Sequence, residues 1–204
     1  MSGLPDLARY NKKEDIVRLL QQGADVNEKD SNGYTALYCA CLNIYTEITE
    51  ILLQNNKINA NLQDNYGSSP FYTACWNNRY ECALIMLKDA RVDINLTDYW
   101  GWSPLMRACY FGHTKTVQLL ISFGRKIDIL KKSTRDWNDI KSGSTALDVA
   151  KQTNNTAVVQ LLQQYQNSFG LFKFLERYLS SPKETQQTLR NQLNLKGNKI
   201  KYKS

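Results

Sequence analysis

Few side chains in this sequence could carry out acid–base, nucleophilic or metal chemistry, and they are not grouped as that chemistry requires. His113 is the single histidine, and a histidine without a placed nucleophile forms no catalytic triad. Cys39 and Cys41 are separated by one residue, and no Cys-x-x-Cys pair or second histidine stands at ligand spacing. Asp136 and Asp139 lie in a polar stretch typical of a solvated loop. We therefore predict no enzymatic activity, no catalytic residue, no metal site and no cofactor.

A short phrase recurs along the chain at a fixed period. Its copies read G-Y-T-A-L-Y-C-A-C from Gly33, G-S-S-P-F-Y-T-A-C from Gly67, G-W-S-P-L-M-R-A-C from Gly101 and G-S-T-A-L-D-V-A-K from Gly143. The first three glycines are 34 residues apart. A period of this size indicates stacked copies of one supersecondary unit. Because the shared residues of such an array build the scaffold, we expect specificity to come from positions at which the copies differ.

Each copy predicts a pair of helices. A Ser or Thr that can cap a helix follows each glycine closely: Thr35, Ser69, Ser103 and Thr145. In the middle two copies a proline, Pro70 or Pro104, then occupies the first helical position. A second apolar run at helical spacing follows, and Gly23 and Gly124 are expected to end two of these second helices in a left-handed conformation.

These phrases resemble the ankyrin repeat, which has a period of about 33 residues and the signature T-P-L-H-x-A. The best match covers residues 101–128, where Gly112-His113, the V-Q-L-L run and Gly124 stand where that family has them. His113 thus fills a helix-start position that histidine holds in many such repeats. The position of the signature histidine departs from the family and holds Tyr38, Tyr72, Met106 and Asp148. The resemblance covers residues 4 to about 164 and implies an all-α ankyrin-repeat solenoid.

We expect about five stacked repeats plus a C-terminal helical cap. The solenoid is assigned to residues 1–167, and its repeats lie near residues 1–30, 31–64, 65–98, 99–140 and 141–167. Residues 168–204 are assigned to a basic helical cap or tail, with a second helix over about 181–193. A cap would cover the last core face of the array. The alternative is a basic amphipathic segment that lies on a membrane surface.

Charge is unevenly distributed between these parts. Residues 1–164 carry 18 Lys and Arg against 17 Asp and Glu, a net charge of +1, whereas residues 165–204 carry 8 against 2, a net charge of +6. A nucleic-acid groove needs positive charge clustered on the folded face, so we expect no nucleic-acid partner. An odd number of cysteines, five, favours reduced thiols. We therefore expect an intracellular monomer that is located in the cytoplasm, with the nucleus as a second candidate location.

Recognition is the function that remains, and aromatic residues mark where it would occur. In proteins of the resembled family, partners dock against the loop tips and the exposed face of the first helix. Eight of the twenty residues at these positions are aromatic, five of them in the Gly101 copy. Tyr and Trp dominate interface hot spots. The predicted partner-binding residues, including one from a nine-residue insertion before Gly143, are Tyr34, Tyr66, Trp76, Tyr99, Trp100, Trp102, Tyr110, Phe111 and Trp137.

Two functions follow from these observations. The first is a non-enzymatic adaptor or scaffold that binds another protein through the concave face, with an aromatic patch centred on the Gly101 copy. The second is a regulatory or targeting subunit whose basic tail contacts a membrane surface or an acidic partner. The insertion, within residues 129–142, is expected either to bind or to act as a disordered spacer. The resemblance also implies that Asn27, Asn61 and Asn95 occupy a position that can be hydroxylated.

Overall fold

The computed structural model describes residues 3–180, with side chains described through residue 168. The chain divides into two compact units, residues 1–161 and residues 162–204. The described residues form ten α-helices and no extended strand. The helices are α1 Leu4–Arg9, α2 Lys13–Gln21, α3 Ala36–Leu42, α4 Thr46–Gln54, α5 Pro70–Trp76, α6 Tyr80–Leu87, α7 Pro104–Tyr110, α8 Thr114–Ser122, α9 Ala146–Gln152 and α10 Thr156–Ser180. The all-α fold expected from the sequence is confirmed.

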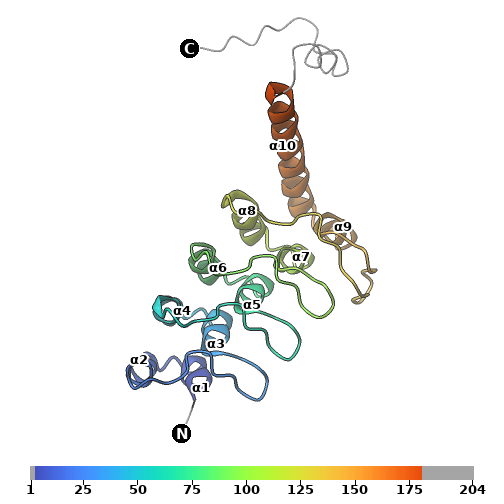
Figure 1. Ribbon diagram of the computed structural model, residues 1–204. Coiled ribbons are helices and arrows are strands. Elements are labelled where there is room, and N and C mark those ends of the chain that lie inside the picture. Colours follow the sequence, from blue (N-terminus) through green and yellow to red (C-terminus); the bar gives the residue numbers. More distant parts are fainter. Residues whose placement is uncertain (1–2, 181–204) are drawn as a thin grey trace, which may run out of the picture. The chain divides into compact units, whose positions relative to one another are not determined.

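The helices of the first unit are arranged in two layers. The first helices of successive repeats, α1, α3, α5, α7 and α9, pack on one another, and the second helices α2, α4, α6 and α8 form the other layer (Figure 1). The loops that connect one repeat to the next extend beyond the first helices on the side away from the second helices (Figure 1). We call the surface formed by these loops and the first helices the loop face.

The local signals that predict the helices are present in the structure. The hydroxyl groups of Thr35, Ser69, Ser103 and Thr145 each accept a hydrogen bond from the backbone N–H three residues later. Pro70 and Pro104 open α5 and α7, where the missing N–H costs nothing. Gly23 and Gly124 have φ angles of +89° and +87° just after their helices. The predicted caps are therefore confirmed at both ends of the helix pairs.

Asparagines join each repeat to the next. The Asn27 side chain donates to the Lys57 carbonyl and accepts from the Asn59 N–H. Asn61 and Asn95 make the same pair of bonds one and two repeats later, to residues 91 and 93 and to residues 126 and 128. Because one amide side chain satisfies both a donor and an acceptor of the neighbouring loop, the ladder fixes the register of the stack.

The loops are also linked directly through their backbones. The Tyr99 N–H donates to the Tyr66 carbonyl, and the Thr134 N–H donates to the Trp100 carbonyl. The close approach leaves no room for a side chain at Gly101, whose φ is +77° and where an added Cβ would lie 2.7 Å from the Thr134 backbone nitrogen. The regular spacing of Gly33, Gly67 and Gly101 thus follows from a repeated contact between turns.

Replacing Gly101 with alanine should therefore destabilise the protein more than the same change at Gly124. Gly124 also has a positive φ, but nothing lies within 4 Å of its added Cβ. Alanine at Gly124 adds only the strain of a left-handed backbone, about 1–3 kcal/mol. Alanine at Gly101 adds the same strain and also a steric clash, which costs about a further 1–3 kcal/mol. Urea unfolding of the two variants measures the difference, and equal costs would contradict the tight contact.

The last helix continues past the repeats. The helix α10 has 25 residues and runs through residues 167 and 168, where the sequence places the end of the solenoid. The helix expected over residues 181–193 lies outside the described residues. Within residues 3–180, no helix combines the length and the apolar character that crossing a membrane requires. The division of the chain at residue 167 and the capping role of residues 168–204 stay predictions.

Candidate functional site

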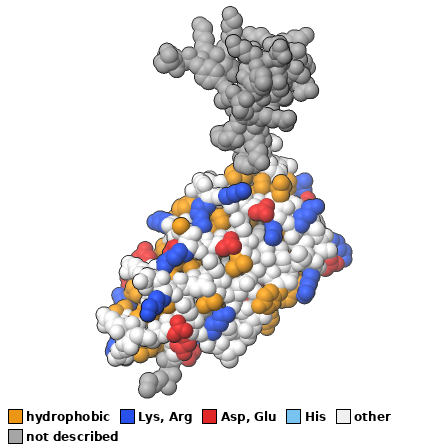
Figure 2. All heavy atoms as spheres, viewed as in Figure 1, with side chains coloured by type: hydrophobic (Ala, Val, Ile, Leu, Met, Phe, Trp, Pro, Cys, Tyr) orange, Lys and Arg blue, Asp and Glu red, His pale blue; other side chains and the backbone are white. Residues whose placement is uncertain are grey.

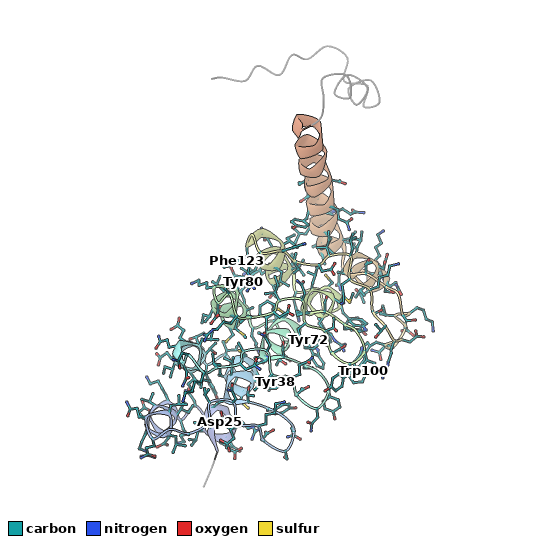
Figure 3. The ribbon with its side chains drawn as sticks, viewed as in Figure 1. Asp25, Tyr38, Tyr72, Tyr80, Trp100 and Phe123 are labelled. Carbon is teal, nitrogen blue, oxygen red and sulfur yellow. The ribbon has the colours of Figure 1, made fainter. Side chains whose placement is uncertain are left out.

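A pocket of about 430 Å³ opens on the loop face across three consecutive copies. Loop turns and first helices both contribute to it, and most of its wall is aromatic. The aromatic side chains that line it are Tyr34, Tyr38, Tyr66, Trp76, Trp100 and Trp137. Its polar lining comes from Asp64, Ser68, Asn77, Asp98 and Arg107. We call this site the loop-face pocket, and Figure 3 shows Trp100 at the loops and Tyr38 and Tyr72 at the first helices, away from Tyr80 and Phe123.

Pairs of rings hold the walls in place. Tyr34 stacks on Tyr38 with a centroid distance of 4.2 Å and an interplanar angle of 6°. Tyr66 and Trp100, from adjacent loops, lie nearly parallel with centroids 6.4 Å apart. Stacked aromatic pairs contribute about 0.5–1.5 kcal/mol beyond the area that they bury. Contacts between neighbouring rings thus contribute to holding the pocket walls.

A buried polar network lies at one end of the pocket. The Arg107 Nη2 donates to Asp98 Oδ2 over 2.8 Å, and both side chains are 1% exposed. The Tyr72 hydroxyl accepts from Arg107 Nε and donates to the same Asp98 oxygen. Burial raises the pKa of Tyr72, so its hydroxyl keeps the proton that it donates. The other Asp98 oxygen accepts the N–H groups of Trp100 and Trp102 and shapes the loop turn.

Aromatic rings surround the Arg107 guanidinium. Its central carbon lies 4.0 Å from the Trp137 ring centre, 4.6 Å from Trp102, 4.8 Å from Trp76 and 5.8 Å from Tyr72. Cation–π contacts of this kind are worth about 2 kcal/mol or more when they are desolvated. Arg107 Nη1 is buried without a hydrogen-bond partner. The guanidinium therefore depends on the rings and on Asp98 for its stabilisation.

The position of Trp102 corrects one expectation from the sequence. Trp102 is fully buried, so in this structure it offers no surface to a partner. Ser68 and Ser144, the residues that follow their glycines in two other copies, are also buried. The turn directs this position inward, and in the Gly101 copy the space is filled by an indole that lies on Arg107. The five aromatic residues of that copy therefore do not form one exposed patch.

The remaining predicted residues divide into three groups. Tyr34, Tyr66, Trp76, Trp100 and Trp137 come together in the loop-face pocket. Tyr99 and Phe111 are exposed, at 58% and 48%, but do not line it. Tyr110 packs edge-on against Trp102, and its hydroxyl accepts from Asn138.

The insertion folds back on the repeats. Trp137 and Ile140 exchange two backbone hydrogen bonds of 2.9 Å and form a tight turn. Asp136 accepts from the Ser142 N–H and from the Lys141 ammonium, which ties the base of the loop together. The turn brings Trp137 onto Arg107. The insertion therefore contacts the Gly101 copy through Trp137. A disordered spacer would make no such contact, so the structure does not support that alternative. Whether the insertion binds a partner stays a prediction.

His113 and the five cysteines lie in structural surroundings. His113 precedes α8, and its Nε2 lies 2.9 Å from the Trp76 carbonyl oxygen. The five cysteines are free and buried. Burial raises the pKa of Cys75 and of Cys109, so their thiols stay protonated and act as small apolar side chains.

Sequence reasoning missed Arg107 and its two partners, Tyr72 and Asp98. A signal existed in the alignment of the copies, because Arg107 stands where the others have Cys39, Thr73 and Val149. A charged residue at a position otherwise held by small or apolar residues needs a buried counter-charge. Asp98 supplies it from the preceding turn.

The paired helices, the projecting loops and the turn-to-turn bonds define a helical repeat protein. A family model described as "Ankyrin repeats (3 copies)" matches residues 6–98 and 86–171. The chain belongs to the ankyrin-repeat family. Repeats of this family generally mediate protein–protein interaction, and the family is typically a non-enzymatic interaction module.

A curated protein is similar to part of the chain. The mitochondrial disaggregase of Homo sapiens is 40% identical over 52 residues, which are 26% of this chain. The match spans 7% of that protein's length. It therefore concerns a short stretch shared with a much longer protein.

Proposed function

We propose that this chain is an adaptor or scaffold that captures a partner protein on its loop face, with the loop-face pocket at the centre of the contact. The observation that carries the proposal is the gathering of six aromatic side chains around one open pocket. Tyr66 is 60% exposed at its rim. Tyr38 is buried, and Tyr34, Trp76, Trp100 and Trp137 are half-buried. Accessible Tyr and Trp side chains that line a pocket are the kind of residue that dominates interface hot spots.

The mixed charge on the repeats favours a partner that binds through shape complementarity and apolar area. It does not favour a partner that binds through a large patch of one charge. Acidic and basic side chains are interspersed over the face of the repeats seen in Figure 2. Interfaces of moderate affinity are dominated by a few buried aromatic anchors, surrounded by residues that exclude water. The rings at the pocket supply such anchors without requiring an extended basic or acidic groove.

Replacing Tyr66 and Trp100 together with alanine should reduce capture of the partner by at least about tenfold, because two anchor rings are lost. The measurement is quantitative affinity capture from a cell extract, with the melting temperature of each variant recorded alongside. Tyr10→Ala is the matched control, because Tyr10 is 68% exposed at the end of α1 and does not line the pocket. Undiminished capture by the double variant would overturn the proposal.

A targeting role for the basic C-terminal residues is the second candidate. Residues 165–204 carry a net charge of +6, and anionic membrane surfaces attract basic segments at about 1 kcal/mol per Lys or Arg. This role involves other residues than those that form the loop face. It is therefore compatible with capture of a partner by the repeats.

A further inference from the structure

The first three loop turns each contain an aspartate at the same position, half-buried at Asp30 and buried at Asp64 and Asp98. Asp30, Asp64 and Asp98 each use one carboxylate oxygen to accept two backbone N–H groups of their own turn. In the first and third turns, the second oxygen also receives an arginine. Arg9 Nη2 reaches Asp30 over 2.5 Å, and Arg107 Nη2 reaches Asp98 over 2.8 Å.

Asp64 differs from the other two. It is 4% exposed, and no Lys or Arg among the residues with described side chains forms an ion pair with it. The two places from which an arginine could come hold other residues. Leu42 ends α3 where Arg9 ends α1, and Thr73 stands in α5 where Arg107 stands in α7.

The loop-face pocket reaches Asp64, whose carboxylate is hydrogen-bonded by the Tyr38 side chain and has no cation beside it among the described side chains. In the Gly101 copy, Arg107 and Trp102 fill the volume next to Asp98. In the Gly67 copy, the corresponding residues are the small Thr73 and Ser68. Asp64 and Ser68 both line the loop-face pocket, whose walls are aromatic. A buried carboxylate without a counter-charge therefore faces a pocket with π faces that attract cations.

We propose that the loop-face pocket receives an arginine side chain of the partner protein, whose guanidinium pairs with Asp64. The proposal rests on the proposed function and names the chemistry that its central site recognises. The mode of binding is the one that the protein uses internally for Arg107, a guanidinium held by a buried carboxylate and stacked among aromatic rings. Arginine fits better than lysine because its flat guanidinium can stack on the rings while it donates to the second Asp64 oxygen.

The probes are three acetylated tripeptide amides, Gly-Arg-Gly and the same peptide with lysine or with citrulline, the neutral isostere of arginine. Binding to the full chain is followed by NMR, through the backbone signals of residues 64–68 and the indole signals of Trp76 and Trp100. We expect saturable shifts with the arginine peptide at a Kd on the order of millimolar. The citrulline peptide should bind at least about tenfold more weakly, because its side chain carries no charge. The lysine peptide should bind several-fold more weakly.

Two variants test the role of Asp64. Asp64→Asn keeps the oxygen that accepts the turn N–H groups but removes the charge, so it should fold and weaken arginine binding by about tenfold or more. Glu81→Gln, an exposed carboxylate on α6 outside the pocket, is the charge-matched control and should bind as the wild type does. Thr73→Arg offers Asp64 an internal arginine in the place that Arg107 has beside Asp98, and it should abolish peptide binding.

Several results would overturn the assignment: equal binding of the arginine and citrulline peptides, lysine binding as tight as arginine binding, unchanged binding by Asp64→Asn, or shifts confined to other surfaces. These failures are distinguishable from failure of the proposed function. If Tyr66→Ala/Trp100→Ala abolishes partner capture while the arginine peptide does not bind, the capture surface stands and the arginine assignment falls.

Discussion

Replacing Arg107 with methionine is expected to lower the free energy of unfolding by about 3–5 kcal/mol, the cost of leaving a buried charge unpaired. The Asp98 carboxylate is 1% exposed and would lose its cation. Tyr72 would also lose its donor, Arg107 Nε. Methionine keeps much of the apolar volume, so the loss reports the network more than a cavity. Urea unfolding of the purified variant measures it.

The double variant Arg107→Met/Asp98→Asn separates the charge from the packing. Asparagine at 98 can still accept the two turn N–H groups, and its amide can donate to the Tyr72 hydroxyl. The double variant should therefore be more stable than Arg107→Met alone. A cost for Arg107→Met of less than about 1 kcal/mol, the value of an exposed ion pair, would contradict the buried network.

Trp102→Ala is expected to cost about 3–5 kcal/mol, the range for removing a buried aromatic side chain. The indole is fully buried between Arg107, Trp137 and Tyr110. Trp100→Ala should cost markedly less, since Trp100 is only half-buried and its removal opens no internal cavity. Denaturant unfolding of the two single variants makes the comparison.

Trp102→Phe is the matched control for the second prediction. Phenylalanine keeps most of the packing and removes the indole Nε1, which is buried without a hydrogen-bond partner. Its cost should fall well below that of Trp102→Ala. Equal losses for Trp100→Ala and Trp102→Ala would show that the two residues are equivalent, as the sequence pattern alone suggests.

The repeat architecture could be predicted from the sequence because its signals are local. A hydroxyl at Thr35 or Ser69 caps its own helix, and Gly124 ends one, so residues a few positions apart determine these features. Register in the stack also follows from the period, since Asn27, Asn61 and Asn95 make the same contacts at three successive junctions. The family match over residues 6–171 confirms this part of the prediction.

The site was only partly predictable because burial at the turns depends on neighbouring copies. Trp102 and Trp100 flank the same glycine, yet one is buried and the other lines the pocket. Ser68 and Ser144 stand at the position equivalent to Trp102. Because both are small, they give no sign in the sequence that a side chain at this position points inward. The contact of Trp137 with Arg107 spans 30 residues and depends on the turn that the insertion forms. The pocket therefore belongs to several copies rather than to the Gly101 copy alone.

The most direct measurement of the central claim is amide hydrogen exchange of the full chain with and without its captured partner. If the loop face is the surface of recognition, the partner should slow amide exchange in the turns at residues 64–68 and 98–102. Exchange in α4, α6 and α8 should change little. Protection confined to the second-helix layer, with the turns unaffected, would contradict the loop face as the surface of recognition.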